Sequence, residues 1–417
     1  MIPLQRLLVF TAAAVAVVLL CGPAAADWSA GVAYYQQGNF AEAVEHFQAV
    51  VRSNPDWPGG YLMLGRCQLA LEQYDDALES LESAVTLDPG DPANVAALSR
   101  ALMAVDRDAA ARELLEGFDT EELSPAWKVE VARMLARCLC AENRTTDAVA
   151  VLQGCLDHDP DNAAVHRAIA VAYEAAGDRS AVLDHLARAF SLDPDDRSSG
   201  RAAAKLALTL AAAAPADDLA AAFNGRAFEI ASSLATAAPG FENALLAGEA
   251  AAAANHLPEA AVWYATAVKE RPQDPVARYR FGCTLATLDR NDEAAGHLRA
   301  ALGAAPETEL AVRIHNQLGR LLACRLELPE AARHYRAAGN DGHAARIHEL
   351  AASYSKALAR LAGLRSNAAE LVGMEAELEK LGDANGVTAV ADRRKAMGQE
   401  IAAIEDNLAA VRAALCQ

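Results

Sequence analysis

Proline recurs along this chain at a fixed interval of 34 residues. The interval separates three pairs of prolines, which are Pro55 and Pro89, Pro160 and Pro194, and Pro272 and Pro306. Proline cannot continue a helix, and the residue before it avoids the helical region, so each position predicts the end of a helix. A fixed period of this length is typical of repeat arrays, in which each short unit buries its apolar face only against its neighbours.

The residues between the prolines repeat as well. A small residue stands 24 positions before the proline and a large apolar residue stands 8 before it, as Gly65 and Leu81 precede Pro89. Gly248 and Tyr264 repeat this arrangement. The spacing of small and large residues predicts two closely packed helices in each repeat. Four turn-forming residues lie between the two helical stretches: Gly38, Asn143, Gly177 and Asp289.

In these positions the sequence resembles the tetratricopeptide repeat family. The resemblance covers about three quarters of the chain, and it implies a right-handed α-solenoid of about nine helix pairs over residues 27–339. The third repeat lacks its closing proline. The sixth repeat is long, and we expect its two helices at 201–213 and 219–237. Apolar residues make up 53% of the chain and aromatic residues only 5%, which also favours an all-α protein.

The first 26 residues predict a signal peptide. Arg6 precedes an apolar run from Leu7 to Leu20, and three alanines end at Ala26. This order of charge, apolar centre and small residues is typical of secretory signals. We therefore expect cleavage after Ala26 and a protein that is periplasmic or secreted. The alternative is a lipoprotein signal at Cys21, which Leu20 fits poorly because such signals prefer a small residue there.

The stretch LDHDPDN, residues 156–162, has two interpretations. Asp157, Asp159 and Asp161 alternate as in the first half of a calcium loop. Such a loop needs glycine at its sixth position and glutamate at its twelfth, whereas this chain has Asn162 and Ala168. The stretch is also one of the proline-containing repeat boundaries. We therefore expect a turn in which Asp and Asn cap the next helix.

The charge and the motifs exclude several classes of function. The formal net charge of −19 disfavours nucleic acid as a partner, because phosphate repels an acidic chain. The sequence contains no phosphate-binding loop, nucleophile elbow or zinc-protease motif. We therefore expect a non-enzyme without cofactor, metal or small-molecule substrate. A disulfide among Cys138, Cys140 and Cys155 stays open, because their geometry cannot be derived from the sequence.

The resemblance also implies a binding surface, because stacked repeats form a concave face lined by the first helix of each pair. Carrying over the family's groove positions gives Arg133, Arg137, Cys140, Arg167, Val171, Glu174, Tyr279, Arg280, Cys283, Arg313, Asn316 and Arg320. Guanidinium groups bind carboxylates well, so these arginines predict an acidic partner. Alternatively, the arginines pair with neighbouring Asp and Glu on an ordinary solvated face.

Residues 340–417 predict a capping helix followed by an antiparallel coiled-coil hairpin. Apolar residues step by three and four in two segments that a turn at 382–386 separates. Folding at Ala384 places Leu371 opposite Met397, and it places the single charged residues of the two seams, Glu375 and Arg394, opposite each other. We expect these two to form an ion pair that fixes the register. Dimerisation with a second chain through the same seams is the alternative.

The turns before this seam have no partner in the second segment. We expect Ile347 and Leu350 to cover the open apolar end of the last repeat instead. Together the features predict an exported scaffold that binds a protein or peptide in its concave groove, with a possible homo-oligomer contact through the hairpin. The alternative function is a non-catalytic accessory subunit of a cell-envelope enzyme or polysaccharide-export complex.

Overall fold

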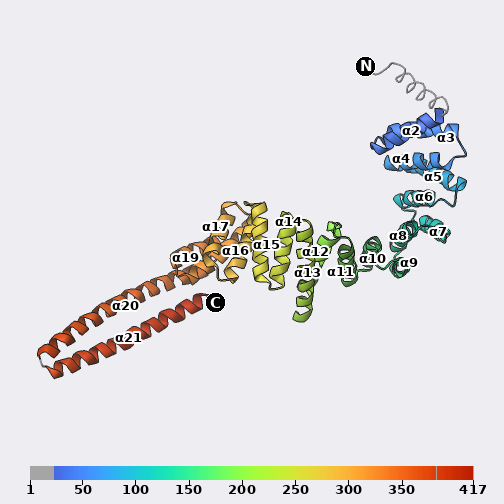
Figure 1. Cartoon of the computed structure of the whole chain (residues 1–417). Coiled ribbons are helices and arrows are strands. Elements are labelled where there is room, and N and C mark those ends of the chain that lie inside the picture. The colour runs from blue at the N-terminus through green and yellow to red at the C-terminus, as the bar shows by residue number, and fades with distance from the viewer. Residues whose placement is uncertain (1–22, 382, 417) are drawn as a thin grey trace, which may run out of the picture. The chain divides into compact units, whose positions relative to one another are not determined.

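The computed structural model describes residues 23–381 and 383–416 (Figure 1). Within these residues the chain forms helices α2 to α21 and no strand, which confirms the all-α expectation. The chain divides into two compact units, one ending at Leu210 and the other beginning at Ala211. Residues 1–22, on which most of the expected signal peptide falls, lie outside the described residues. The expected cleavage point after Ala26 falls within α2.

The N-terminal unit consists of successive antiparallel helix pairs. The pairs are α2 (Pro23–Gln36) with α3 (Phe40–Ser53), α4 (Pro58–Ala70) with α5 (Tyr74–Leu87), α6 (Pro92–Ala104) with α7 (Asp108–Glu116), α8 (Pro125–Ala141) with α9 (Thr145–His158), and α10 (Ala163–Ala176) with α11 (Arg179–Leu192). The third pair is the one without its closing proline, and its second helix has only 9 residues. Helix α12 (Arg197–Ala213) crosses the division between the units.

The C-terminal unit continues the same arrangement. Its helices are α13 (Asp217–Ala237), α14 (Phe241–Ala253), α15 (Leu257–Glu270), α16 (Pro275–Thr287), α17 (Asn291–Gly303), α18 (Thr308–Cys324), α19 (Leu328–Ala337), α20 (Asp341–Leu381) and α21 (Ala384–Cys416). In chain order, α2 to α19 make up the nine pairs that the sequence predicts. No helix among the described residues has both the length and the apolar character that crossing a membrane requires.

Helix α12 begins four residues before the expected start at Arg201. The reason lies in Asp196, whose carboxylate accepts a hydrogen bond from the backbone N–H of Ser199 at 3.2 Å. The same carboxylate accepts hydrogen bonds from the hydroxyl groups of Ser198 and Ser199. Capping of this kind satisfies backbone donors at a helix start, so the first turn forms around Asp196.

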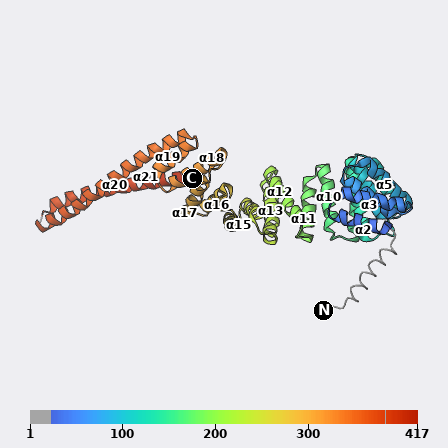
Figure 2. The ribbon, with the colours of Figure 1, turned by 90° about the horizontal axis from the view of Figure 1, so that it is seen from above.

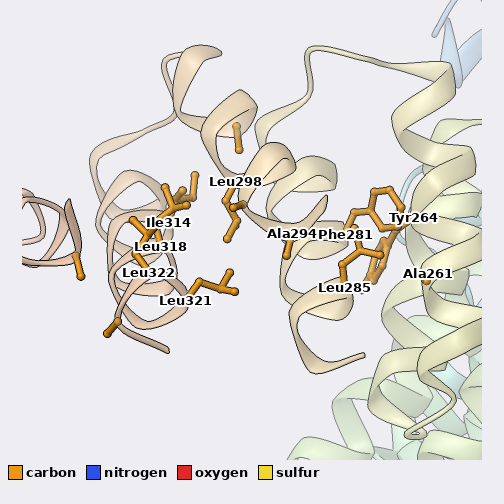
Figure 3. Close-up of a cluster of buried hydrophobic side chains, with 14 of the residues drawn as sticks. Ala261, Tyr264, Phe281, Leu285, Ala294, Leu298, Ile314, Leu318, Leu321 and Leu322 are labelled. Atoms are coloured by element: carbon orange, nitrogen blue, oxygen red, sulfur yellow. The ribbon is translucent and has the colours of Figure 1, made fainter. Parts of the chain in front are cut away.

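Small residues bring the two helices of a pair close together, as the repeat pattern predicts. A Cβ atom on Gly65 would lie 2.5 Å from Cγ of Leu81, and one on Gly248 would lie 2.6 Å from Cδ1 of Tyr264. Leu81 is fully buried and Tyr264 is 2% exposed. The large residue of one helix therefore occupies the space that the glycine leaves open. Figure 3 shows how such side chains continue from α15 to α18 as one core in the C-terminal unit.

The turn between the helices of a pair requires one residue in the left-handed conformation. The four predicted turn residues have positive φ angles, with Gly38 at 79°, Asn143 at 60°, Gly177 at 77° and Asp289 at 59°. Asp106 and Asn255 take the same conformation in their repeats, whereas two other repeats place a less suitable residue at this point, Glu72 and Leu326. The position is therefore fixed by the geometry of the pair even where the residue type does not favour it.

The LDHDPDN stretch contains the end of α9, up to His158, and the capped turn that joins α9 to α10. Asn162 caps α10, because its Oδ1 accepts a hydrogen bond from the backbone N–H of Val165 at 3.2 Å. Its Nδ2 donates to Oδ2 of Asp159 at 2.9 Å, and Asp161 pairs with Arg188. The turn interpretation is confirmed by these contacts. Among the described residues, no group of three or more His, Cys, Asp or Glu side chains could hold a metal ion.

Helices α20 and α21 form the antiparallel hairpin, which is visible in Figure 2. The Nη1 atom of Arg394 lies 3.1 Å from Oε2 of Glu375, so the expected ion pair is present within one chain. Arg365 pairs with Glu405 at 2.6 Å. Leu361 and Leu371, both on the expected seam, are buried. The seam therefore closes within the chain in the expected register.

Both ends of the hairpin contact the last helix pair. Ile347, near the start of α20, is buried in the same core as Leu318 and Leu322 of α18, and Leu350 packs against that core. Leu415, at the end of α21, also packs there. The carbonyl oxygen of Leu415 accepts a hydrogen bond from Sγ of Cys324 at 3.4 Å. The open end of the repeat array is therefore covered by two segments that are far apart in sequence.

The three cysteines of the fourth pair are thiols that form no disulfide. Burial raises the pKa of the Cys138 thiol to about 11, and it also raises the pKa values of Cys140 and Cys155. A thiol whose pKa is raised by burial is a poor nucleophile and a poor metal ligand. Cys138 therefore serves as a small packing residue.

Candidate partner-binding grooves

The N-terminal unit contains a groove of about 360 Å³ between three successive first helices, α6, α8 and α10. Its lining consists of Arg100, Met103, Glu130, Arg133, Met134, Ala136, Arg137, Cys140, Ala168, Val171 and Ala172, and we refer to it as the first groove. Four of these residues, Arg133, Arg137, Cys140 and Val171, were expected from the sequence. They come together because each lies on the first helix of its pair.

Positive charge is in excess in the first groove. Glu130 is the only carboxylate among the lining residues, and it accepts hydrogen bonds from Arg100 at 2.6 Å and from Arg133 at 3.1 Å. Among the described residues, no carboxylate lies within ion-pair distance of Arg137. One carboxylate therefore faces three guanidinium groups, and the groove has unused capacity to bind an anionic group.

The first groove also has an apolar side. Val171 of α10 is 61% exposed, whereas Val165 and Ile169 of the same helix are fully buried. Met103 and Met134 are buried and belong to the same lining. Methionine adapts its shape to different neighbours, so the apolar side can accept more than one side-chain shape. The groove therefore combines arginine donors with a small apolar surface.

Arg167, which was expected in the groove, is not among its lining residues. Its Nη1 atom lies 2.8 Å from Oδ2 of Asp196 and 3.9 Å from Asp193. Burial raises the pKa of Asp196, but hydrogen bonds from Ser198, Ser199 and Arg167 outweigh this and hold the pKa well below its usual range. Arg167 thus connects α10 to the start of α12, which is a structural role.

The C-terminal unit contains a second groove, of about 470 Å³. Its lining consists of Pro275, Val276, Tyr279, Arg280, Glu307, Glu309, Leu310 and Arg313. Three expected residues, Tyr279, Arg280 and Arg313, come together here. Arg280 pairs with Glu249 at 3.0 Å and Arg313 with Glu309 at 2.5 Å. The charges of the second groove are therefore balanced, in contrast to those of the first.

Four further expected residues, Glu174, Cys283, Asn316 and Arg320, lie outside the linings of both grooves. Asn316 accepts a hydrogen bond through Oδ1 from Nδ2 of Asn340 at 2.5 Å, which connects α18 to the start of α20. Arg320 lies near the Cys283 thiol and the Tyr335 hydroxyl. Burial raises the pKa values of both groups, and the positive charge of Arg320 opposes that rise.

Sequence reasoning missed Arg100 and Glu130. Arg100 lies in the degenerate third repeat, where no groove position was carried over, but a local signal identifies it. It directly follows the small residue of its first helix, Ser99, as Arg137 follows Ala136. Glu130 could be found from its position three residues before Arg133, a spacing at which helical side chains meet.

Comparison with known proteins identifies the repeats of the N-terminal part. A tetratricopeptide repeat family model matches residues 23–92, and a second one matches residues 68–128 and 139–208. A search of curated proteins found no significant match.

Several solved structures are similar to the chain. A tetratricopeptide repeat protein from Parabacteroides merdae is 16% identical, with 63% of this chain and 99% of that chain covered and a TM-score of 0.40. The C-terminal part of a repeat protein from Cytophaga hutchinsonii is 14% identical, with 59% and 96% covered and a TM-score of 0.44. YrrB, described as a TPR protein with an unusual peptide-binding site, is 16% identical, with 41% and 87% covered and a TM-score of 0.33. By the family models, the helix pairs of residues 23–128 and 139–208 are tetratricopeptide repeats.

Proposed function

We propose that this chain is a non-catalytic scaffold that binds a protein partner through its first groove. The proposal depends on one observation: the lining of the first groove has three arginines and only one carboxylate, and it includes the exposed Val171. A partner segment with a carboxylate next to a small apolar side chain complements both features. The carboxylate accepts hydrogen bonds from Arg133 and Arg137, and the apolar side chain packs on Val171.

The partner segment binds in an extended conformation. Residues two apart in an extended chain point to the same side, so an acidic and an apolar residue at this spacing reach the groove together. Binding desolvates Arg137, whose charge has no carboxylate partner within the described residues. A partner carboxylate therefore adds an ion pair at Arg137 without first breaking one, whereas at Arg133 it competes with Glu130.

A display library of random peptides with free C-termini, selected against residues 27–417, tests the groove. We expect the selected peptides to be enriched in Asp, Glu or a terminal carboxylate near an apolar residue. The double variant R133E/R137E should bind a selected, fluorescently labelled peptide at least about tenfold more weakly, because two charge-assisted contacts become repulsive.

The matched control is R52E/R179E, which makes the same change of charge on exposed arginines of second helices α3 and α11. It should leave the dissociation constant within about twofold, because exposed charges at a distance are screened by salt. Equal binding by the two double variants would exclude the first groove as the site. Circular dichroism of both variants establishes that they are folded.

We also propose that the chain is exported. Support comes from Arg6, the apolar run up to Leu20 and the small residues before Asp27. Mass spectrometry of the protein from its native cells should give a mature form that begins at Asp27. An intact Met1, or a lipid on Cys21, would contradict this proposal.

A further inference from the structure

Two pairs of histidines join the first helix of a repeat to its second helix. In the N-terminal unit, Nδ1 of His166 on α10 lies 3.0 Å from Nδ1 of His185 on α11. In the C-terminal unit, Nδ1 of His315 on α18 lies 2.8 Å from Nδ1 of His334 on α19. Both pairs are 19 residues apart and occupy equivalent positions of their repeats, four residues before the small residue, Ala170 or Gly319.

These distances fit a hydrogen bond between two imidazoles better than a metal site. The ring centroids are 5.2 Å apart in the first pair and 5.1 Å apart in the second, so the two Nδ1 atoms face each other almost in line. Two nitrogens that bind one ion would instead both point at the ion, to one side of the line between them. Each pair therefore shares one proton in an N–H···N bond.

The contacts of His166 assign the direction of the first bond. Nε2 of His166 lies 3.1 Å from the carbonyl oxygen of Pro160, which can only accept, so Nε2 carries the proton. Nδ1 of neutral His166 is then the acceptor, and Nδ1 of His185 is the donor. A first added proton goes to Nε2 of His185 and leaves this bond intact. A second proton on Nδ1 of His166 removes the acceptor, and two cations then face each other.

The surroundings of the first pair disfavour charge. Burial lowers the pKa of His185, the positive charge of His166 lowers it further, and Asp184 on the same helix opposes both. Arg167, next to His166, is already neutralised by Asp196. The ring of Tyr173 on α10 stacks on His185.

The second pair has the same character. Burial lowers the pKa values of both His315 and His334, and His315 lowers that of His334 further. Arg299 on α17 and Arg333 on α19 act in the same direction, whereas Glu330, whose Oε1 lies 3.9 Å from Nε2 of His334, opposes them. Glu330 is itself paired with Arg299 at 3.1 Å.

Both pairs hold a helix that forms a wall of a groove. Helix α10 carries Ala168 and Val171 of the first groove, and α18 carries Leu310 and Arg313 of the second. We propose that the two histidine pairs make the grooves acid-sensitive: double protonation separates α10 from α11 and α18 from α19, and the bound partner is released. The release of a partner rests on the proposed function, whereas the opening of the helix pairs does not.

The linkage between protonation and folding determines whether the helix pairs open in acid or in base. A histidine whose pKa is lower in the folded state than in the unfolded state stabilises the fold above its unfolded pKa of about 6.5. That stability is lost as the pH falls through the lower, folded pKa. The opening is therefore an acid effect, and the pairs are closed at neutral pH.

The fourth repeat provides a matched control. Its equivalent positions hold Ala132 on α8 and Val151 on α9, which pack in one apolar cluster and cannot titrate. The double variant H166A/H185V copies this pair into the fifth repeat and removes both protonation sites. The variant H315A/H334V does the same in the ninth repeat.

Hydrogen exchange of residues 27–417 at pH 7.5 and pH 5.0, corrected for the intrinsic pH dependence of exchange, tests the opening without any partner. We expect protection of α10–α11 and α18–α19 to fall at least about tenfold at pH 5.0, the factor for one pKa unit, while α8–α9 changes little. H166A/H185V should abolish the fall in α10–α11 and retain it in α18–α19. An equal fall in all three pairs, or a fall that survives in the variant, would overturn the proposal.

If a variant does not fold, nuclear magnetic resonance titration of the imidazoles in the unsubstituted protein tests whether the histidine pairs resist protonation. One histidine of each pair must titrate below the ordinary value of about 6.5, and titration of all four at or above it contradicts the proposal. For release, a peptide selected on the first groove should bind about tenfold more weakly at pH 5.0, and less so in H166A/H185V. If no peptide binds at pH 7.5, the proposed function fails, and the exchange and titration results still decide whether the pairs open.

Discussion

Replacing Gly65 by alanine tests whether the close approach of α4 and α5 limits the stability of the N-terminal unit. The added Cβ would lie 2.5 Å from Cγ and 2.8 Å from Cδ2 of Leu81, and 3.2 Å from the backbone oxygen of Ala77. Leu81 is fully buried, so it has no free space into which it can move. Overpacking of this kind costs about 1–3 kcal/mol.

An opposing effect must be subtracted. Alanine in the interior of a helix is more favourable than glycine by about 0.5–1 kcal/mol, because glycine loses more backbone entropy on folding. Because backbone as well as side chain surrounds the new methyl group, the overpacking cost lies in the upper part of its range. We expect Gly65→Ala to destabilise the unit by about 1–2 kcal/mol.

Gly154 gives the matched control. It also lies inside a helix of the same unit, α9, but it is exposed and a Cβ there would meet nothing within 4 Å. Gly154→Ala should therefore stabilise by about 0.5–1 kcal/mol, through the propensity effect alone. Urea denaturation followed by circular dichroism measures both changes. A higher urea midpoint for both variants would refute the reasoning, because the Cβ at position 65 would then cause no overpacking.

Three other changes have defined outcomes. Glu72→Gly should raise the free energy of unfolding, measured by urea denaturation, by up to about 1 kcal/mol, because Glu72 has a φ of 60° that strains a residue with a Cβ. Arg394→Ala should cost about 1–2 kcal/mol in thermal denaturation, because it leaves the largely buried carboxylate of Glu375 unpaired, and leucine at both positions should restore the loss. Asp196→Asn should lower stability at pH 7 and have a progressively smaller effect below pH 4, because the pKa of Asp196 is depressed and its stabilising charge is lost only in acid.

Each of these outcomes can fail in a definite way. Destabilisation by Glu72→Gly would mean that the side chain contributes more than the strain costs. A hairpin that the loss of Arg394 does not weaken would mean that solvent screens the Glu375 carboxylate fully. A constant effect of Asp196→Asn from pH 7 to pH 3 would mean that the amide fails to cap α12 for a reason other than charge.

The parts of the fold that follow from regular spacings in the sequence could be predicted. The helix pairs, their turns and the hairpin register follow from spacings of three, four and 34 residues, which the chain displays directly. The start of α12 was missed because Asp196 acts through two serines that also fit a loop. Whether a residue caps a helix depends on the local backbone geometry, so the residue type alone is a weak indication of where the helix begins.

The candidate site was predicted only in part, for a related reason. Arg137 and Val171 could be placed on the concave face because helical periodicity determines which side of a helix they occupy. The partner of Arg167 lies 29 residues further along the chain, on the next repeat, and it removes the guanidinium from the groove. The histidine pairs are 19 residues apart on two helices, a separation that no single-helix period identifies.

The ion pair in the hairpin affects the end of the repeat array, although Glu375 lies far from it in sequence. A shift of the hairpin register by one heptad would move α21 along α20 by about 10 Å. Leu415 would then leave the core that it shares with Ile347 and α18. The apolar steps of the seam tolerate such a shift, because they repeat every seven residues, but the Glu375–Arg394 and Arg365–Glu405 ion pairs do not. These charged pairs therefore favour the one register in which both ends of the hairpin cover the last helix pair.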